Sequence, residues 1–322
     1  MTTRFTKLAL SAATLTAATL ATLSAAPATA VTAPLSHARV AVHFDLAGGQ
    51  LPENIAAGRN GISYVTFAGS RQIARLSRGG AITVLATLPA PTDGGVHTPA
   101  LGFPLTTGIV RAPDGTLYVG YTTGTADLTG IWKLAPGRHT PVRIAALPAA
   151  GLPNGIALNT HTNTLYVADS VLGTIFAVPT SGGTATVWSK APELAAAGFL
   201  GVNGMKIRNG AVWATNLDQG TVLRIPITRH RHAGKVEIKA TGLKGIDDFA
   251  FTGRGDTLLA AIDPSSTVEL VTADGTHSVV LDAGDGLQNP TSIAVRGTTV
   301  QVLSAAYLTQ QDPNLLLAQL KK

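Results

Sequence analysis

The chain has 322 residues, of which 45% are hydrophobic and only 13% are charged, and its formal net charge is +6 at pH 7. The only basic cluster is Arg229 to His232, and aromatic residues make up 5%, so the stripe of basic and aromatic side chains typical of a nucleic-acid binder is missing and we expect no nucleic-acid partner. The chain has no cysteine, which excludes disulfides, zinc–thiolate and iron–sulfur sites and a cysteine nucleophile.

The N-terminus has the pattern of a signal peptide. Arg4 and Lys7 precede a weakly apolar run that ends near Leu23, and a small-x-small triplet follows it. A membrane anchor is the alternative, but the run is shorter than the roughly 20 apolar residues that a spanning helix needs, and Thr and Ser interrupt it. We therefore expect residues 1–30 to be removed on export, leaving a secreted, extracellular protein of residues 31–322 with no membrane association.

Six segments of the remaining sequence resemble one another at a period of roughly 40 to 50 residues. Each opens with a polar residue, continues as an apolar strand, turns at Gly, Asn or Asp and returns as a second strand. The opening residues are Glu53, Thr107, Asn154, Asn203, Asp247 and Thr291. In the third segment the alternating residues predict strands at 155–158, 164–168, 174–178 and 184–189. This pattern predicts an all-β fold, a six-bladed β-propeller with four-stranded blades.

The two ends of the mature chain predict how the ring closes. The sixth unit contains strands near 293–295 and 299–305, and residues 315–320 supply a third. Residues 40–46 can provide the fourth strand, so that an N-terminal strand closes the last blade. This arrangement would remove an exposed sheet edge. We expect a single domain and a monomer.

The opening residue of each unit begins the innermost strand of a blade, so the six openers should surround one mouth of the central channel. Four of them carry side-chain oxygens, namely Glu53, Asn154, Asn203 and Asp247. Such ligands suit Ca²⁺, which takes about six to eight oxygens, although Mg²⁺, Mn²⁺ or Zn²⁺ is also compatible with them. The competing explanation is that these residues only favour the sharp bend before each inner strand.

The same segments resemble a known superfamily of six-bladed propellers. Similar motifs are Leu-Pro-Asn-Gly-Ile-Ala-Leu at 152–158, Thr-Leu-Tyr-Val-Ala-Asp-Ser at 164–170, Gly-Val-Asn-Gly-Met at 201–205 and Asp-Asp-Phe at 247–249. The superfamily includes gluconolactonases, the senescence marker protein (regucalcin), paraoxonases and strictosidine synthase. In its lactonase members a Glu, two Asn and an Asp from four blades hold one divalent cation, usually calcium. The resemblance assigns that role to Glu53, Asn154, Asn203 and Asp247.

The resemblance implies a calcium-dependent hydrolase of a small-molecule lactone or ester, with the metal at the channel mouth. Asp247 or Asp248 would orient or deprotonate the attacking water, although Asp248 only partly matches the paraoxonase pattern. Paraoxonases use a His pair above the metal. His97, in the long segment 88–106, is the candidate here, and its alternative is an exposed loop residue. Because strictosidine synthase has this fold without a metal, a non-catalytic extracellular binding propeller remains the alternative function.

Overall fold

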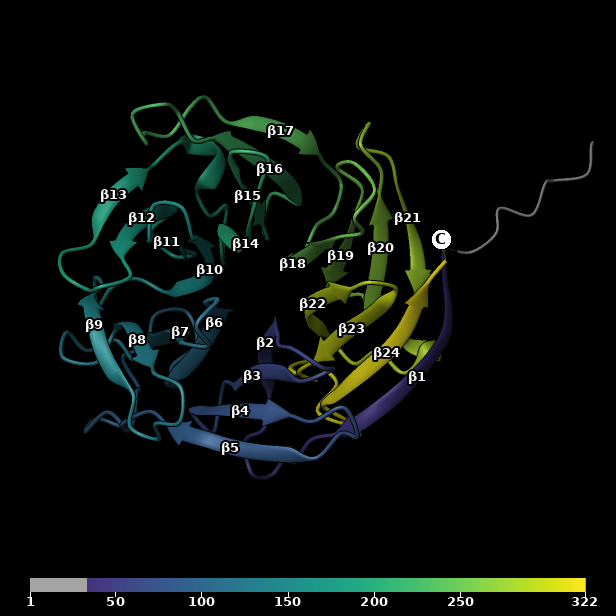
Figure 1. Ribbon diagram of the computed structural model, residues 1–322, viewed down its shortest axis with the longest axis horizontal. Helices are drawn as coiled ribbons and strands as arrows, with labels where there is room; N and C mark the ends of the chain where they lie inside the picture. Colours follow the sequence, from purple (N-terminus) through teal and green to yellow (C-terminus); the bar gives the residue numbers. More distant parts are fainter. Residues whose placement is uncertain (1–33, 322) are drawn as a thin grey trace, which may run out of the picture. The chain divides into compact units, whose positions relative to one another are not determined.

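The computed structural model describes residues 34–321, and the predicted signal peptide lies outside them. These residues form six four-stranded antiparallel sheets arranged as a ring of blades (Figure 1). The all-β, six-bladed propeller predicted from the repeats is therefore confirmed. Within residues 34–321, no helix is long and apolar enough to cross a membrane.

The strands follow one another outward from the channel in the first five blades. The first blade contains β2 (Pro52–Ala57), β3 (Ser63–Phe67), β4 (Gln72–Leu76) and β5 (Ile82–Thr87). The second contains β6 (Leu105–Arg111), β7 (Leu117–Thr122), β8 (Gly130–Leu134) and β9 (Val142–Ala146). The third contains β10 (Pro153–Asn159), β11 (Thr164–Asp169), β12 (Thr174–Pro179) and β13 (Thr186–Ser189). The fourth contains β14 (Val202–Arg208), β15 (Ala211–Asn216), β16 (Thr221–Pro226) and β17 (Glu237–Ala240). The fifth contains β18 (Ile246–Phe251), β19 (Leu258–Ile262), β20 (Thr267–Val271) and β21 (His277–Leu281).

The sixth blade joins the two ends of the chain. Its sheet order is β22 (Pro290–Arg296), β23 (Thr299–Ser304), β24 (Asn314–Leu320) and β1 (Leu35–His43). The N-terminal strand thus pairs antiparallel with β24, as predicted. It begins at Leu35, earlier than the expected residue 40, because Leu35 itself packs into an apolar cluster between the fifth and sixth blades.

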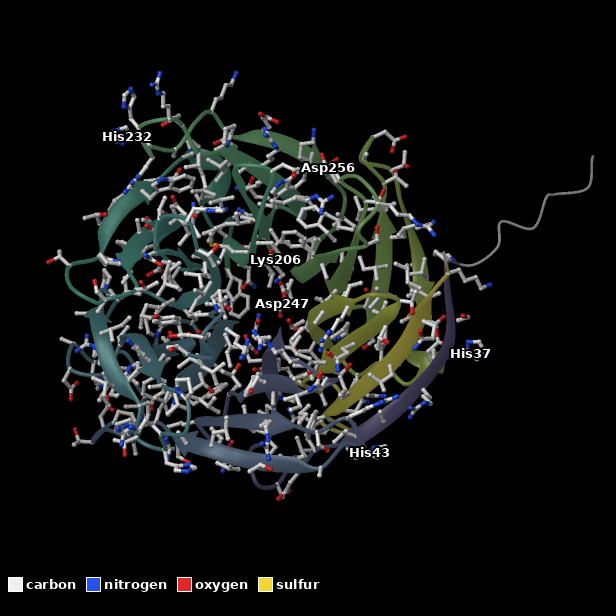
Figure 2. The ribbon with its side chains drawn as sticks, in the orientation of Figure 1. His37, His43, Lys206, His232, Asp247 and Asp256 are labelled. Carbon is white, nitrogen blue, oxygen red and sulfur yellow. The ribbon has the colours of Figure 1, made fainter. Side chains whose placement is uncertain are left out.

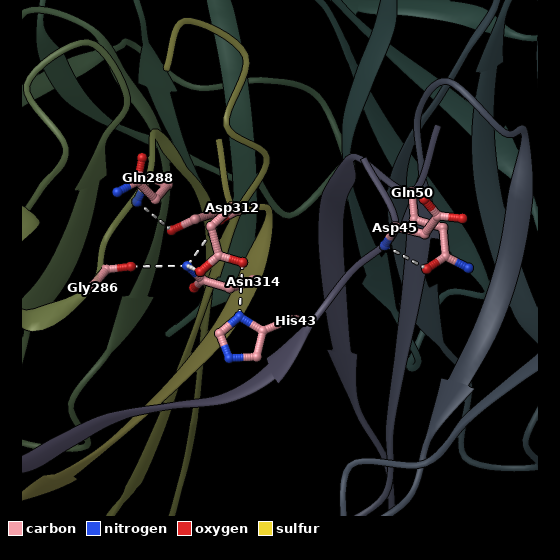
Figure 3. A network of polar contacts seen from close by, with 8 residues as sticks. His43, Asp45, Gln50, Gly286, Gln288, Asp312 and Asn314 are labelled. Atoms are coloured by element: carbon pink, nitrogen blue, oxygen red, sulfur yellow. Dashed lines mark hydrogen bonds and ion pairs between the residues drawn. The ribbon is translucent and has the colours of Figure 1, made fainter. Parts of the chain in front are cut away.

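Polar and apolar contacts hold this closure. Figure 3 shows His43 beside Asp312, with 2.8 Å between Nδ1 and Oδ1. The buried Asn314 donates from Nδ2 to the backbone oxygens of Gly286 at 2.9 Å and Asp312 at 3.0 Å. Val42 packs into the apolar cluster between the first and last blades. The ring therefore closes by strand pairing and by burial together.

Side-chain hydroxyls join neighbouring blades around the channel by donating to backbone oxygens of the next inner strand. The pairs are Thr66 to Thr107 (2.6 Å), Thr107 to Pro153 (2.7 Å), Ser170 to Val202 (2.7 Å), Thr215 to Asp247 (2.7 Å) and Thr291 to Pro52 (2.8 Å). Thr107 and Thr291, the two Thr openers, thus connect neighbouring blades. These bonds join the blades at five of the six junctions of the ring.

The glycines that follow three of the openers allow the inner strands to approach closely. A Cβ atom on Gly108 would lie 2.3 Å from the Asn154 backbone oxygen, and one on Gly155 would lie 2.2 Å from that of Asn203. Neither glycine has a positive φ, so neither is required by a turn. The Asn-Gly pattern in this repeat therefore reflects packing between blades rather than chain reversal.

We expect Val42→Ala to lower the free energy of unfolding by about 2 kcal/mol, because it removes two buried methyl groups from the cluster that closes the ring. Val84 also lies on an outer strand but is 42% exposed, so Val84→Ala should change stability by less than about 0.5 kcal/mol. Urea denaturation of both variants measures the difference. Equal effects would show that closure does not depend on this packing.

Candidate functional site at the channel mouth

Four side chains with oxygen atoms lie at the starts of inner strands at one end of the channel, which we call the channel mouth. They start the inner strands of four blades and are almost fully buried: Glu53 is 6% exposed, Asn154 4%, Asn203 2% and Asp247 8%. The strand register shifts at or beside each of these residues. A bulge bends the strand locally and changes the direction of a side chain. The repeated register shift can therefore direct these side chains towards the channel mouth.

The contacts of these side chains differ from those of turn residues. Asn203 donates from Nδ2 to Asp247 Oδ1 at 2.9 Å, and its own Oδ1 is buried without a hydrogen-bond partner among the described residues. Tyr307 donates its hydroxyl to Glu53 Oε2 at 2.5 Å. Within residues 34–321, no hydrogen bond joins the side chain of Glu53, Asn154, Asn203 or Asp247 to a backbone group. None of the four side chains therefore stabilises a turn by a hydrogen bond to the backbone.

The carboxyl groups at the mouth are held in a way that disfavours their ionisation. Burial raises the pKa of Glu53 to about 7, with the charges of Asp263 and Asp248 adding to the rise and the Tyr307 hydrogen bond opposing it. Burial, together with the charge of Glu53, raises the pKa of Asp247 well above its usual value. Burial also raises the pKa of Asp263 to about 7. Among the described residues no basic side chain forms an ion pair with these three, so a bound cation would be favoured here.

The donor set can accept a divalent cation only if the amides take part. Within residues 34–321, no three His, Cys, Asp or Glu side chains form a metal-binding group. Glu53 and Asp247 contribute carboxylate oxygens, and Asn154 and Asn203 contribute amide oxygens. The unpaired Oδ1 of Asn203 is an acceptor that still lacks a partner. Oxygen ligands of this kind fit Ca²⁺ with coordination positions left open.

Asp248 follows Asp247 in the chain but is engaged elsewhere. Its Oδ1 accepts from Lys206 Nζ at 2.6 Å and its Oδ2 accepts from Ser292 Oγ at 2.7 Å, and its side chain is 1% exposed. Figure 2 shows Lys206 and Asp247 close to the centre of the ring. The structure thus brings Asp248 to the channel with both carboxylate oxygens occupied, one of them by an ammonium group.

The structure does not bring His97 into contact with the four side chains. It lies in the connection between β5 and β6, which is long as expected, and its side chain is 76% exposed. Its Nδ1 lies 2.8 Å from Asp93 Oδ2 in the same connection. His97 therefore has the position of an exposed loop residue.

Two residues at the mouth were missed as site candidates. Tyr307 lies in the connection between β23 and β24, which is longer than the corresponding corner of the other blades, so the repeat aligns no residue with it. Asp263 directly follows β19, and its Oδ1 is buried without a partner among the described residues. Asp263 lies between β19 and β20, the second and third strands of its blade. This position in the repeat indicates from the sequence that it lies near the channel mouth.

A family model described as the SMP-30/Gluconolactonase/LRE-like region matches residues 108–259. The matched part includes Asn154, Asn203 and Asp247 and excludes Glu53. The chain thus carries an SMP-30/gluconolactonase-like region within a six-bladed propeller, and the resemblance inferred from its motifs is confirmed. No curated protein matches the sequence.

Several solved structures share the fold while differing in their described roles. Regucalcin from Agrobacterium tumefaciens, described as a calcium-binding protein, is 16% identical over 87% of this chain and 95% of that chain, with a TM-score of 0.62. A catalytically inactive virginiamycin B lyase from Staphylococcus aureus with quinupristin is 17% identical over 85% and 82%, with a TM-score of 0.60. A chain of a nidogen/laminin complex is 17% identical over 81% and 100%, with a TM-score of 0.56. Likeness at this level shows the fold alone.

We expect the stability of the metal-free protein to fall as pH rises from 4.5, the usual pKa of Glu53, towards its folded-state pKa of about 7. In this window the unfolded chain loses the Glu53 proton while the folded chain keeps it, so deprotonation favours unfolding. Asp247 and Asp263 act in the same direction. Urea denaturation in a chelator at about pH 5 and about pH 8 measures the change.

Glu53→Gln should flatten this pH dependence, because Gln does not titrate but can still accept the Tyr307 hydrogen bond. Glu237→Gln is the control, since Glu237 lies on an outer strand with its side chain 44% exposed. Equal pH dependence in the wild type and Glu53→Gln would contradict the assignment.

Proposed function

We propose that the protein is an exported, monomeric, metal-dependent hydrolase of small lactones or related esters, with Ca²⁺ held at the channel mouth. The ligands would be Glu53, Asn154, Asn203 and Asp247. The observation that carries this proposal is the set of four buried, oxygen-bearing side chains at matching starts of inner strands. Asn203 contacts Asp247 among them, and the two carboxyl groups have no basic partner among the described residues. The gluconolactonase-like region and the fold shared with a calcium-binding regucalcin support it.

When bound, a divalent cation would lower the pKa values of Glu53 and Asp247 and stabilise the negative charge that develops on the carbonyl oxygen of the ester. Asp247 would accept a proton from the attacking water, since Asn203 fixes its carboxylate by a hydrogen bond of 2.9 Å. Hydrolysis of a lactone then gives a hydroxy acid, with the water proton passing to the alkoxide. Asp248 is a poorer base because Lys206 and Ser292 occupy both of its oxygens.

Tyr307 would fix the metal ligand Glu53. Its hydroxyl reaches Glu53 from the sixth blade, and burial raises the pKa of Tyr307 well above 10, so the group stays a hydrogen-bond donor. A donor of this kind restricts the rotation of a ligating carboxylate.

Calcium should raise the thermal unfolding midpoint of the protein measured against a chelator, because it binds only the folded state. Asn154→Ala should abolish the rise by removing a ligand. The matched control is Asn159→Ala, at the opposite end of the same strand, where the side chain accepts only local backbone hydrogen bonds. A failure of calcium, magnesium, manganese and zinc to shift the midpoint would rule out the metal-dependent hydrolase.

Hydrolysis is tested with D-glucono-δ-lactone and an aryl ester, by titrating the acid released. Asp247→Asn should reduce the rate by at least about a hundredfold, since it removes the proton acceptor. Calcium binding without turnover of any lactone or ester would favour the alternative, a non-catalytic binding propeller.

Tyr307→Phe should weaken calcium binding by about tenfold or more, the usual effect of losing a hydrogen bond to a metal ligand. Isothermal calorimetry measures the affinity. Tyr64→Phe, in the first blade, is a control with the same chemical change. Unaltered affinity in Tyr307→Phe would show that Glu53 is oriented by other contacts.

A further inference from the structure

The other end of the channel forms a cavity of about 390 Å³, which we call the lower funnel. Its walls are the parts of the six inner strands that follow the openers. They comprise residues 54–57, 109–111, 156–158, 205–207, 250–251 and 293–295. The volume lies within the range of small-molecule sites.

The charged residues that line the lower funnel are basic, and the neutral Asn54 lines it as well. Arg111 and Lys206 line it, whereas no Asp or Glu does among the described residues. The channel mouth has the opposite character, because Glu53 and Asp247 face it. The two ends of one channel therefore differ in charge, and they would select ligands of opposite sign.

Both cations keep unused hydrogen-bond donors. Lys206 is 30% exposed and donates to Asp248, which leaves two of its three ammonium hydrogens. The Arg111 guanidinium carbon lies 5.9 Å from the centre of the Tyr64 ring. Its Nε is buried without a partner, and within residues 34–321 no hydrogen bond from its side chain is found. An Arg placed over an aromatic ring with free N–H groups is suited to a carboxylate.

The remaining lining is mostly aliphatic. Val110, Leu158 and Ile207 belong to it and are only partly buried, and Ala and Val side chains of other inner strands complete it. A ligand that fits must therefore bring a negative group for the two cations and an apolar body for the walls. A hydrated metal ion or a polycation satisfies neither requirement.

We propose that the lower funnel is a second binding site, for a small organic carboxylate with an apolar body. Arg111 and Lys206 bind the carboxylate, and the aliphatic walls of the inner strands cover the body. This site is separate from the channel mouth, and it does not depend on the hydrolase function proposed there.

The test uses benzoate as the probe and benzamide as its uncharged counterpart, titrated by isothermal calorimetry in the presence of a chelator so that the channel mouth holds no metal. Benzoate should bind and benzamide should bind at least about tenfold more weakly, because benzamide lacks the negative charge that strengthens hydrogen bonds to Arg111 and Lys206. Equal affinities would overturn the proposal.

Arg111→Gln should weaken benzoate binding by about tenfold or more. Arg224→Gln is the matched control: it changes the net charge equally but lies on an outer strand, paired with Glu237. Equal losses in the two variants would mean that only general charge attracts benzoate, and would overturn the site.

Ala57→Phe tests the location without changing charge, since Ala57 lines the lower funnel and is exposed at the end of β2, so a phenyl ring there would occupy the funnel. We expect loss of benzoate binding with the calcium-dependent rise in unfolding midpoint retained. Unchanged benzoate binding would place the probe elsewhere. If the wild type did not bind calcium, the metal site proposed at the channel mouth would be contradicted, whereas the benzoate result would still test the lower funnel.

Discussion

Closure of the ring is the constraint on which the rest of this structure depends. Because β1 pairs with β24, the first and last blades are neighbours, and the starts of six inner strands face one axis. Hydroxyls such as Thr107 and Thr291 then link blades at five of the six junctions, and Ser292 contacts Asp248 at the remaining one. Residues far apart in the chain therefore lie at the same end of the channel.

The ring assigns opposite roles to two adjacent acidic residues. Asp247 faces the channel mouth and contacts Asn203, whereas the carboxylate of Asp248 is neutralised by Lys206. Successive residues of a strand point to opposite faces of the sheet, so neighbours in sequence can have different partners. Burying Glu53 and Asp247 without a basic partner is unfavourable for folding, which is the usual condition of a site that binds a cation.

The shared architecture says little about chemistry by itself. Structures with this fold include a calcium-binding regucalcin, a lyase and a chain of a nidogen/laminin complex. Activity on such a frame is set by the side chains at the channel ends and by the connections that cover them. Here the identities of the openers and of Arg111 and Lys206 distinguish the two ends.

The sequence by itself determined the six-fold repeat, the four-stranded blades, the closing strand and the family resemblance, because strand periodicity and turn residues are local properties that each repeat displays again. It also placed Glu53 and Asp247 at the starts of inner strands. Only the tertiary structure decided that Tyr307 reaches Glu53, that Asp248 pairs with Lys206 and that His97 stays exposed. These outcomes depend on connections whose lengths differ from blade to blade and on contacts between different blades, and neither leaves a periodic signal in the chain.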